Sequence, residues 1–519
     1  MTEAAEGARD GLTAVTKGAL IMLLGTLGLV AENFIAQVLL AHSLTTDQWS
    51  DFRLGLALTG LLATLGALGL PSAVARNLPY TGREDERRGI VRVAFTVGIP
   101  AAVVVAAVLF LVGFPVGASD PLFGLTMQLF AGALFFGLVS GLIASVFQGY
   151  EDVYPNAIFV QILTPSLFLA FLATAWLLPT GGSYYTFALV GYVVANLVTL
   201  LSLVAYARRR LPRHLTPGPV APGVSRRLLL FALPLFAVGI FSYLTQNADT
   251  LLLGVFDRSL VAFYNAPLLL ARLLQVGLGS LAFIFLPVTA RFVRDGKRDA
   301  VRVTYTTTTK WIVLTSLPLF LVFFFAPVRS LGFVFGPNYT GANEALQIVV
   351  TGAFLSTVVG PAVAAQVSFG RTWLLFYNAA AAAGANVLLS LLFIPLYGVL
   401  GAAIAWAVAN ALFTTLSAVE LAVLDHVHPF QRHYVLPLLL TLVPLSVLLA
   451  VLNLSLPLWS LPAVVIGIGV FYFFAVVLSR SVDEGDRMLL EVIERFIGRR
   501  IPLIRRIGRY GMPRAPPPS

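Results

Sequence analysis

Three long apolar stretches of the chain carry polar and ionised side chains at helical spacing. Residues at i, i+3, i+4 and i+7 share one helix face, so their amides, hydroxyls and charges can act together on a ligand or an ion. Within residues 242–254 this face holds Ser242, Thr245, Gln246 and Asp249, with Asn247 beside it. The other two stretches, residues 260–289 and 17–41, hold Asn265, Arg272, Gln275 and Gly279, and Thr26, Asn33 and Gln37 with Glu32 at the edge.

The ionised members of these faces limit where the faces can point. An ionised side chain at the centre of a bilayer costs about 2.5–3.5 kcal/mol, so Glu32, Asp249 and Arg272 must face other helices or water. Arg272 lies about twelve residues from the outer end of its stretch, near the midplane. Two interpretations are open. Asp249 and Arg272 form a structural ion pair that offsets both costs, or these groups bind a ligand or an ion.

Other charged residues give weaker signals. Lys310 lies only a turn or two inside its apolar stretch, so we expect its ammonium to snorkel to water. Arg76 and Arg291 end apolar stretches and are expected to anchor the topology at the cytoplasmic mouth, where they could also steer an anion inward.

Metal and thiol chemistry have little support in the sequence. Cysteine is absent, which excludes disulfides, thiolate catalysis and most zinc sites. Asp425, His426, His428 and His433 are close in sequence but have no fixed helical spacing, so they carry no metal prediction. We therefore expect no metal and no cofactor, apart from a coupling proton or sodium ion.

The elements that must position the polar faces are transmembrane helices. Of the 519 residues, 58% are hydrophobic and 11% are charged, whereas soluble domains carry about 25% charged residues. Apolar runs of roughly 20 residues predict an all-α integral membrane protein with fourteen spans, the first of which is too long for a signal peptide. The spans lie near residues 17–41, 54–75, 92–113, 122–147, 156–178, 184–206, 229–255, 260–289, 304–327, 343–369, 372–394, 398–424, 435–453 and 458–479.

The basic residues orient these spans. With both termini in the cytoplasm, the inner segments hold 29 of the 34 lysines and arginines. Arg53, Arg258 and Arg329 lie in outer segments, and Arg272 and Lys310 lie within spans. Cytoplasmic loops of membrane proteins retain Lys and Arg in this way. The net charge of +10 is therefore a topology signal in the cell membrane, and we expect no nucleic-acid partner.

An internal repeat divides the first twelve spans into two sets of six. Residues 69–76 (GLPSAVAR) resemble 286–291 (LPVTAR), and 194–199 (VANLVT) resemble 408–414 (VANALFT), at offsets of 214 to 216 residues. Six crossings return the chain to its starting side. We therefore expect two six-helix lobes that are related by a pseudo-twofold axis along the membrane normal, with a cleft between them.

The repeat and the charges predict six segments. The order is a cytoplasmic N-terminus, an N-lobe, a linker rich in Pro and Arg, a C-lobe, two extra helices and a basic amphipathic tail. A tail of this composition is expected to lie on the anionic cytoplasmic leaflet. The boundaries are residues 1–16, 17–206, 207–228, 229–424, 425–479 and 480–519.

Several short motifs resemble those of Wzx-type polysaccharide flippases, which belong to the multidrug/oligosaccharidyl-lipid/polysaccharide (MOP) exporter superfamily. The motifs are loose, but they occur in the family's order over about residues 15 to 480. They are 69–76 (GLPSAVAR), 246–254 (QNADTLLLG) followed by 261–266 (VAFYNA), 335–339 (FGPNY) and 394–403 (IPLYGVLGAA).

This resemblance implies a transporter that flips a polyprenyl-(pyro)phosphate-linked oligosaccharide to the outer leaflet by alternating access. Arg272 is then expected to bind the phosphate, while Gln246, Asn247, Gln275, Asn33 and Gln37 meet sugar hydroxyls. Asp249 or Glu32 is expected to carry the coupling proton or sodium ion. The implied partners are the polyprenyl-linked glycan, the lipid bilayer and, as further candidates, glycan-assembly enzymes.

Two other functions remain as alternatives. A cation-coupled multidrug exporter of the same superfamily handles cationic clients, and it would favour an acidic cleft without a central arginine and usually twelve spans. A membrane glycan polymerase or glycosyltransferase needs a catalytic group of residues near the surface. The expected outer loops contain no paired carboxylates of that kind.

Overall fold

The computed structural model describes residues 25–79, 81, 84–177, 184–210, 223–452, 461–479 and 481, and these residues form helices joined by short turns. Eleven of the described helices are long and apolar enough to cross a membrane, or twelve when a bent pair counts as one span. They correspond to the second to thirteenth predicted spans. The first and last predicted spans are described only in part, over 25–43 and Leu461–Leu478, so the count of fourteen stays a prediction.

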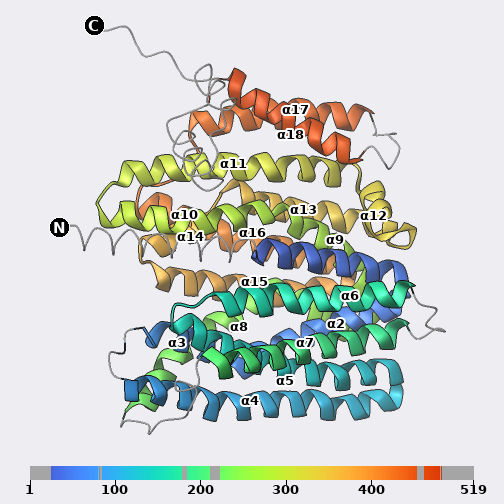
Figure 1. The fold of residues 1–519 in the computed structure, drawn as a ribbon. Coiled ribbons are helices and arrows are strands. Elements are labelled where there is room, and N and C mark those ends of the chain that lie inside the picture. Colours follow the sequence, from blue (N-terminus) through green and yellow to red (C-terminus); the bar gives the residue numbers. More distant parts are fainter. Residues whose placement is uncertain are drawn as a thin grey trace. The chain divides into compact units, whose positions relative to one another are not determined.

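Contacts divide the chain into two compact units, Met1–Ala262 and Phe263–Ser519. In the first unit an unlabelled helix over residues 25–43 precedes the labelled helices (Figure 1). The others are α2 (Thr46–Ala67), α3 (Leu70–Asn77), α4 (Glu84–Ser119), α5 (Pro121–Gly149), η1 (Asn156–Leu163), α6 (Thr164–Leu177), α7 (Tyr184–Arg210), α8 (Val224–Phe256) and η2 (Arg258–Leu260).

The second unit begins within α9. Its α13 and α15 each pack against α16, and α17 and α18 pack against α11. The helices are α9 (Val261–Leu274), α10 (Val276–Arg294), α11 (Arg298–Phe325), α12 (Pro327–Phe335), η3 (Pro337–Ala342), α13 (Asn343–Val358), α14 (Ala362–Ser368), α15 (Thr372–Tyr397), α16 (Val399–Leu424), α17 (Arg432–Leu452) and α18 (Leu461–Leu478).

The structural division falls one helix later than the predicted boundary between the lobes. Helix α8 packs against α2, α3 and α4, so it belongs to the first unit, although the sequence repeat places it at the start of the C-lobe. The six-segment organisation and the pseudo-twofold axis stay predictions. Residues 1–24, 211–222 and 482–519, which include the predicted N-terminus, most of the linker and the basic tail, lie outside the described residues.

The bend in the second span has a local cause. Leu68 and Gly69 both adopt the left-handed conformation, with φ of 51° and 69°, and α2 and α3 meet at 46°. Pro71 follows in the first turn of α3, where its missing N–H breaks no helical hydrogen bond. A Cβ atom at Gly69 would lie 2.3 Å from the carbonyl oxygen of Ala232, so glycine also permits the close approach of α8.

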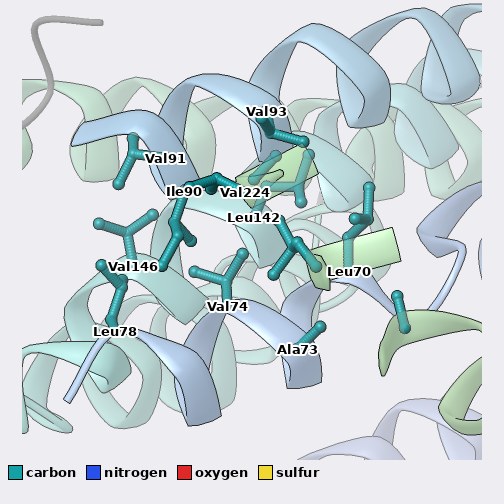
Figure 2. Close-up of a cluster of buried hydrophobic side chains, with 13 residues drawn as sticks. Leu70, Ala73, Val74, Leu78, Ile90, Val91, Val93, Leu142, Val146 and Val224 are labelled. Carbon is teal, nitrogen blue, oxygen red and sulfur yellow. The ribbon is translucent and has the colours of Figure 1, made fainter. Parts of the chain in front are cut away.

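A buried apolar cluster holds the same end of the first unit together. Leu70 and Val74 of α3, and Leu78 directly after it, pack with Ile90 of α4 and Val224 of α8 (Figure 2). Their burial fixes the start of α8, the helix that carries the polar face of residues 242–254, against α3, α4 and α5.

The expectation that Lys310 snorkels to water is wrong. Its side chain is 2% exposed, and its ammonium donates a hydrogen bond of 2.8 Å to the carbonyl oxygen of Ser481, just beyond α18. Tyr472 of α18 donates to the carbonyl oxygen of Lys310 in turn. The extra helices cover this face of α11, so the ammonium lies at the carboxyl end of α18, where the helix dipole favours a cation.

Candidate functional site

The helix over residues 25–43 presents Glu32 to α6. Its Oε1 accepts a hydrogen bond of 2.7 Å from the Ser166 hydroxyl. Its Oε2 is buried and has no hydrogen-bond partner among the described residues. A buried carboxylate oxygen without a donor is costly, so this atom marks a polar position that packing alone does not satisfy.

The two predicted amide residues of the same helix have different surroundings. Asn33 is exposed, and its Nδ2 donates to the carbonyl oxygen of Leu29 at 2.9 Å. Gln37 is 6% exposed, and its Oε1 accepts from the indole N–H of Trp49 at 3.2 Å. Gln37 therefore joins this helix to α2, and Asn33 is the more accessible of the two amides.

Some residues of the polar face of α8 are buried or bonded to the backbone of the same helix. Thr245 donates to the carbonyl oxygen of Phe241 at 2.8 Å, and Asp249 is 0% exposed. The amide of Asn247 is partly buried and donates to the carbonyl oxygen of Tyr243 at 3.3 Å. Gln246 is also half-buried, so Gln246 and Asn247 retain accessible surface and Asp249 does not.

The Tyr243 hydroxyl fixes α8 to α2. It donates to the carbonyl oxygen of Ala57 at 2.5 Å. Gly60 makes this approach possible, because a Cβ atom there would lie 2.6 Å from the Tyr243 oxygen. The polar face of α8 is thus positioned by a tyrosine that the sequence analysis did not single out.

A three-residue ion cluster joins the first turns of α2 to the turn that follows α8. The sequence analysis missed it. Arg258 of η2 pairs through Nε with Asp51 of α2 at 2.9 Å, and through its Nη2 with Asp120 at the start of α5. The Asp51 side chain is 8% exposed, whereas that of Arg258 is 33% exposed. The guanidinium also lies over the ring of Phe123, 4.5 Å from its centroid.

Backbone and hydroxyl contacts support the same cluster. The Ser50 hydroxyl donates to the carbonyl oxygen of Ser259 and accepts from the N–H of Ala262. The pKa of Asp120 lies below its usual value, chiefly because the backbone N–H of Phe123 donates to its carboxylate, with Arg258 adding to the effect. Ion pairs and hydrogen bonds therefore hold the turn after α8 against α2 and the start of α5.

In the second unit the predicted phosphate ligand lies beside a helix break. Arg272 is in the last turn of α9, which ends at Leu274, and α10 begins at Val276. Gln275 lies between the two helices, and its side chain makes no cap hydrogen bond to α10. Arg272 and Gln275 are both half-buried.

The two predicted cytoplasmic-mouth arginines lie in last turns, where cations are favoured by the helix dipole. Arg76 of α3 is stacked over the ring of Phe231, 4.6 Å from its centroid, so it also packs against α8. Arg291 of α10 is exposed.

A second polar cluster that the sequence analysis missed joins α14, α15 and α16. Arg371 makes two hydrogen bonds to Asp425, of 2.7 and 2.9 Å, and these bonds raise the pKa of Arg371. Glu420 accepts from Asn378 at 2.8 Å and from the amide of Gln366. Asp425 is therefore occupied by an arginine, and among the described residues no group of three His, Asp or Glu side chains could hold a metal ion.

Each unit contains a cavity. The polar residues that were predicted to bind substrate line neither of these two cavities. One cavity of about 520 Å³ in the first unit is bordered by Gly60, Gly137 and Gly239, with the polar groups of Tyr192 and Asn196. Another of about 560 Å³ in the second unit lies between α10 and α11 and includes Val276 and Gly277, next to Gln275.

The missed contacts have a common cause. Asp51, Asp120 and Arg258 lie far apart in the sequence, so no local spacing connects them. One signal was present: Asp120 directly precedes Pro121, the pattern of an N-cap followed by a first-turn proline.

Comparisons with known proteins agree with this architecture. Residues 15–293 match the family model described as polysaccharide biosynthesis protein. No curated protein sequence matches the chain. The range of the family match includes every residue proposed above for the transport site, from Glu32 to Arg291.

Solved structures of transporters share the fold at low sequence identity. The lipid II flippase MurJ, in an inward closed conformation, has a TM-score of 0.67 and 13% identity, covering 88% of this chain and 98% of that one. An inward-facing multidrug resistance MATE family transporter of the MOP superfamily has a TM-score of 0.63 and 13% identity, covering 79% and 99%. A MOP superfamily transporter from Pyrococcus furiosus has a TM-score of 0.53 and 15% identity, covering 78% and 93%.

The fold is therefore that of the MOP transporters, as the resemblance to Wzx-type flippases implied. Because the family match covers more than half of the chain, the protein belongs to the polysaccharide biosynthesis protein family, with many apolar helices and the architecture of a multi-pass membrane transporter.

Proposed function

We propose that the protein flips a polyprenyl-(pyro)phosphate-linked oligosaccharide from the inner to the outer leaflet of the cell membrane by alternating access. The observation that carries this proposal is the match of residues 15–293 to the polysaccharide biosynthesis family, because all the candidate polar residues lie within it. The structural likeness to a lipid II flippase is compatible with a lipid-linked cargo.

The phosphate of the carrier is assigned to Arg272. Its guanidinium can donate two parallel hydrogen bonds to phosphate oxygens, and such charge-assisted bonds are about twice as strong as neutral ones. Arg272 is half-buried, so its guanidinium retains surface through which such bonds can form.

The sugars are assigned to the amide side chains. Asn33, Gln246, Asn247 and Gln275 each carry both a donor and an acceptor, as sugar hydroxyls require. Gln37 can contribute its amide nitrogen and one remaining lone pair of its oxygen, because that oxygen already accepts one hydrogen bond from Trp49. Arg76 and Arg291 would raise the local concentration of the anionic substrate at the cytoplasmic mouth.

We assign the binding of the coupling ion to Glu32 in preference to Asp249. Oε2 of Glu32 is buried and receives no hydrogen bond from a described donor, so it is the first candidate to bind a coupling ion. Asp249 is fully buried, and the hydroxyl of the adjacent Thr250 donates to its carboxylate over 3.5 Å. It is the second candidate to bind a coupling ion.

Transport by reconstituted protein tests the central assignment. The substrate is a fluorescent polyprenyl pyrophosphate sugar in proteoliposomes, and its arrival in the outer leaflet is measured by quenching. Arg272→Ala should lower the rate about 10- to 100-fold, because it removes charge-assisted hydrogen bonds worth about 1.5–3 kcal/mol. Arg294→Ala is the matched control, since the Arg294 side chain is 76% exposed and pairs with the neighbouring Asp295.

The outcomes separate the flippase from its rivals. Unchanged flipping by Arg272→Ala, with Arg294→Ala also unchanged, would remove Arg272 from the transport site. Efflux of ethidium with no flipping of the lipid-linked sugar would favour the cation-coupled multidrug exporter. Formation of a longer glycan in the vesicles would favour the polymerase.

A further inference from the structure

A groove on the first unit combines an apolar floor with two arginines at its rim. The groove has a volume of about 560 Å³ and lies over α5, between α4 and α7, which flank α5 in Figure 1. Its rim carries Arg92 of α4 and Arg208 of α7. None of the residues proposed for transport lines it.

The floor of the groove is part of a packed core and is therefore preformed. Ile143 of α5 is 6% exposed and Ala207 of α7 is 2% exposed, and Phe95 and Val204 pack against the cluster to which they belong. Ile99 continues the lining seven residues beyond Arg92. Seven helical residues span about 10 Å, so the groove extends from the charged rim toward the middle of the bilayer.

The groove opens toward lipid and not toward the transport residues. Beyond Ile99, helix α4 exposes a series of large apolar side chains, which is the composition of a lipid-facing surface. These include Val103, Val104, Val108 and Leu111, with exposed fractions of 48%, 60%, 48% and 61%. A ligand in the groove would thus have its apolar part continuous with the bilayer.

The rim lies at the arginine-rich end of the unit. Helix α4 begins, and α5 and α7 end, on the side that the distribution of basic residues assigns to the cytoplasm. Basic pockets between transmembrane helices on that side bind lipid headgroups. We propose that this groove is a binding site for an anionic phospholipid of the inner leaflet, with its phosphate at Arg92 and Arg208 and an acyl chain against Phe95, Ile99 and Ile143.

Native mass spectrometry of the purified full-length protein tests the site. Phosphatidylglycerol and phosphatidylcholine are titrated separately, and the affinity for the first bound lipid is compared. A basic residue at a membrane surface contributes about fivefold to binding of an anionic lipid, so two arginines predict a preference of about 25-fold for phosphatidylglycerol. Arg92→Gln with Arg208→Gln should remove this preference and leave phosphatidylcholine binding unchanged.

Two further variants separate a site from a general charge effect. Arg209→Gln with Arg226→Gln removes the same charge from exposed positions at the same end of α7 and α8, outside the groove, and should retain the preference. Thr96→Trp fills the groove from an exposed position on α4 with both arginines intact, and should weaken the binding of both lipids.

Three results would overturn the proposal. The parent protein could bind both lipids equally, or the two double variants could lose the same affinity, which would indicate net charge alone. Undecaprenyl phosphate could also displace phosphatidylglycerol at equal concentration, in which case the groove belongs to the lipid carrier.

Discussion

Arg258 is shared by two carboxylates, so its loss affects both of them unequally. Asp51 is almost fully buried and would lose its cationic partner, whereas Asp120 retains the backbone N–H of Phe123. Breaking a buried pair from one side typically costs about 3–5 kcal/mol, and the partial exposure of Arg258 favours the lower end of this range. We expect Arg258→Gln to lower the apparent Tm of the detergent-purified protein by several degrees.

The double variant Arg258→Gln with Asp51→Asn is the control for that effect. It replaces the stranded carboxylate by a neutral amide, so it should recover part of the lost Tm. A double variant as unstable as the single one would show that Arg258 acts through packing on Phe123 and not through Asp51.

Asp120 gives the same cluster a defined acid dependence. Since its folded-state pKa is lowered, its contribution to stability is fully present above the usual value of about 3.9 and is lost as pH falls through the lowered value. The difference in apparent Tm between the parent and Asp120→Asn should therefore shrink as the pH falls below about 4. A difference that is independent of pH would instead indicate that the Asp120 oxygen acts only as an N-cap.

Single residues of the candidate site illustrate what local patterns can and cannot predict. Helical spacing found the polar faces, because that information lies within one turn or two. It could not show that Gln37 is taken by Trp49, or that Lys310 is covered by α18. Those contacts depend on which other helix packs against the face, and the sequence of the face alone does not contain that choice.

At the scale of helices, close packing of α13 on α16 requires a residue without a side chain. A Cβ atom at Gly352 would lie 2.5 Å from the Cα atom of Ala407, and backbone atoms cannot rotate away. Gly352→Ala should therefore destabilise the second unit, by about 1–3 kcal/mol if the helices move apart slightly. The measurement is the urea or thermal unfolding of the purified protein, followed by tryptophan fluorescence.

Gly384 provides the matched control on α15. Nothing lies within 4 Å of a Cβ atom at this position, so Gly384→Ala should gain about 0.5–1 kcal/mol from helix propensity. Opposite signs for the two substitutions are expected. Equal effects would show that the approach of α13 to α16 is looser than the structure describes.

The helices themselves were the most predictable part of the fold. Apolar runs predicted the second to thirteenth spans, since each must bury its backbone hydrogen bonds within the segment. The break at Gln275 was not predicted. It falls within an unbroken apolar run, with Pro267 eight residues earlier, so composition gave no sign of its position.

For the whole molecule, the distribution of basic residues connects the fold to the driving force. The predicted orientation puts 29 of the 34 basic residues on the inner side, and with that orientation an inside-negative potential would drive an anionic substrate outward. The proposed exchange of that anion for a proton on Glu32 would move positive charge inward in the same cycle. Both steps are therefore expected to be favoured by the potential.

The voltage dependence of flipping follows from this charge movement. Moving one charge across 100 mV gains about 2.3 kcal/mol, so about 60 mV should raise the steady-state ratio of outer to inner substrate about tenfold for each charge moved per cycle. Potassium gradients with valinomycin set the potential in proteoliposomes that contain the protein in one orientation. A dianionic pyrophosphate carrier, or proton exchange through Glu32, adds to the number of charges and steepens the response. Glu32→Gln should reduce the slope by one charge if Glu32 carries the proton, and a ratio that does not change with potential would contradict transport of the substrate as an anion.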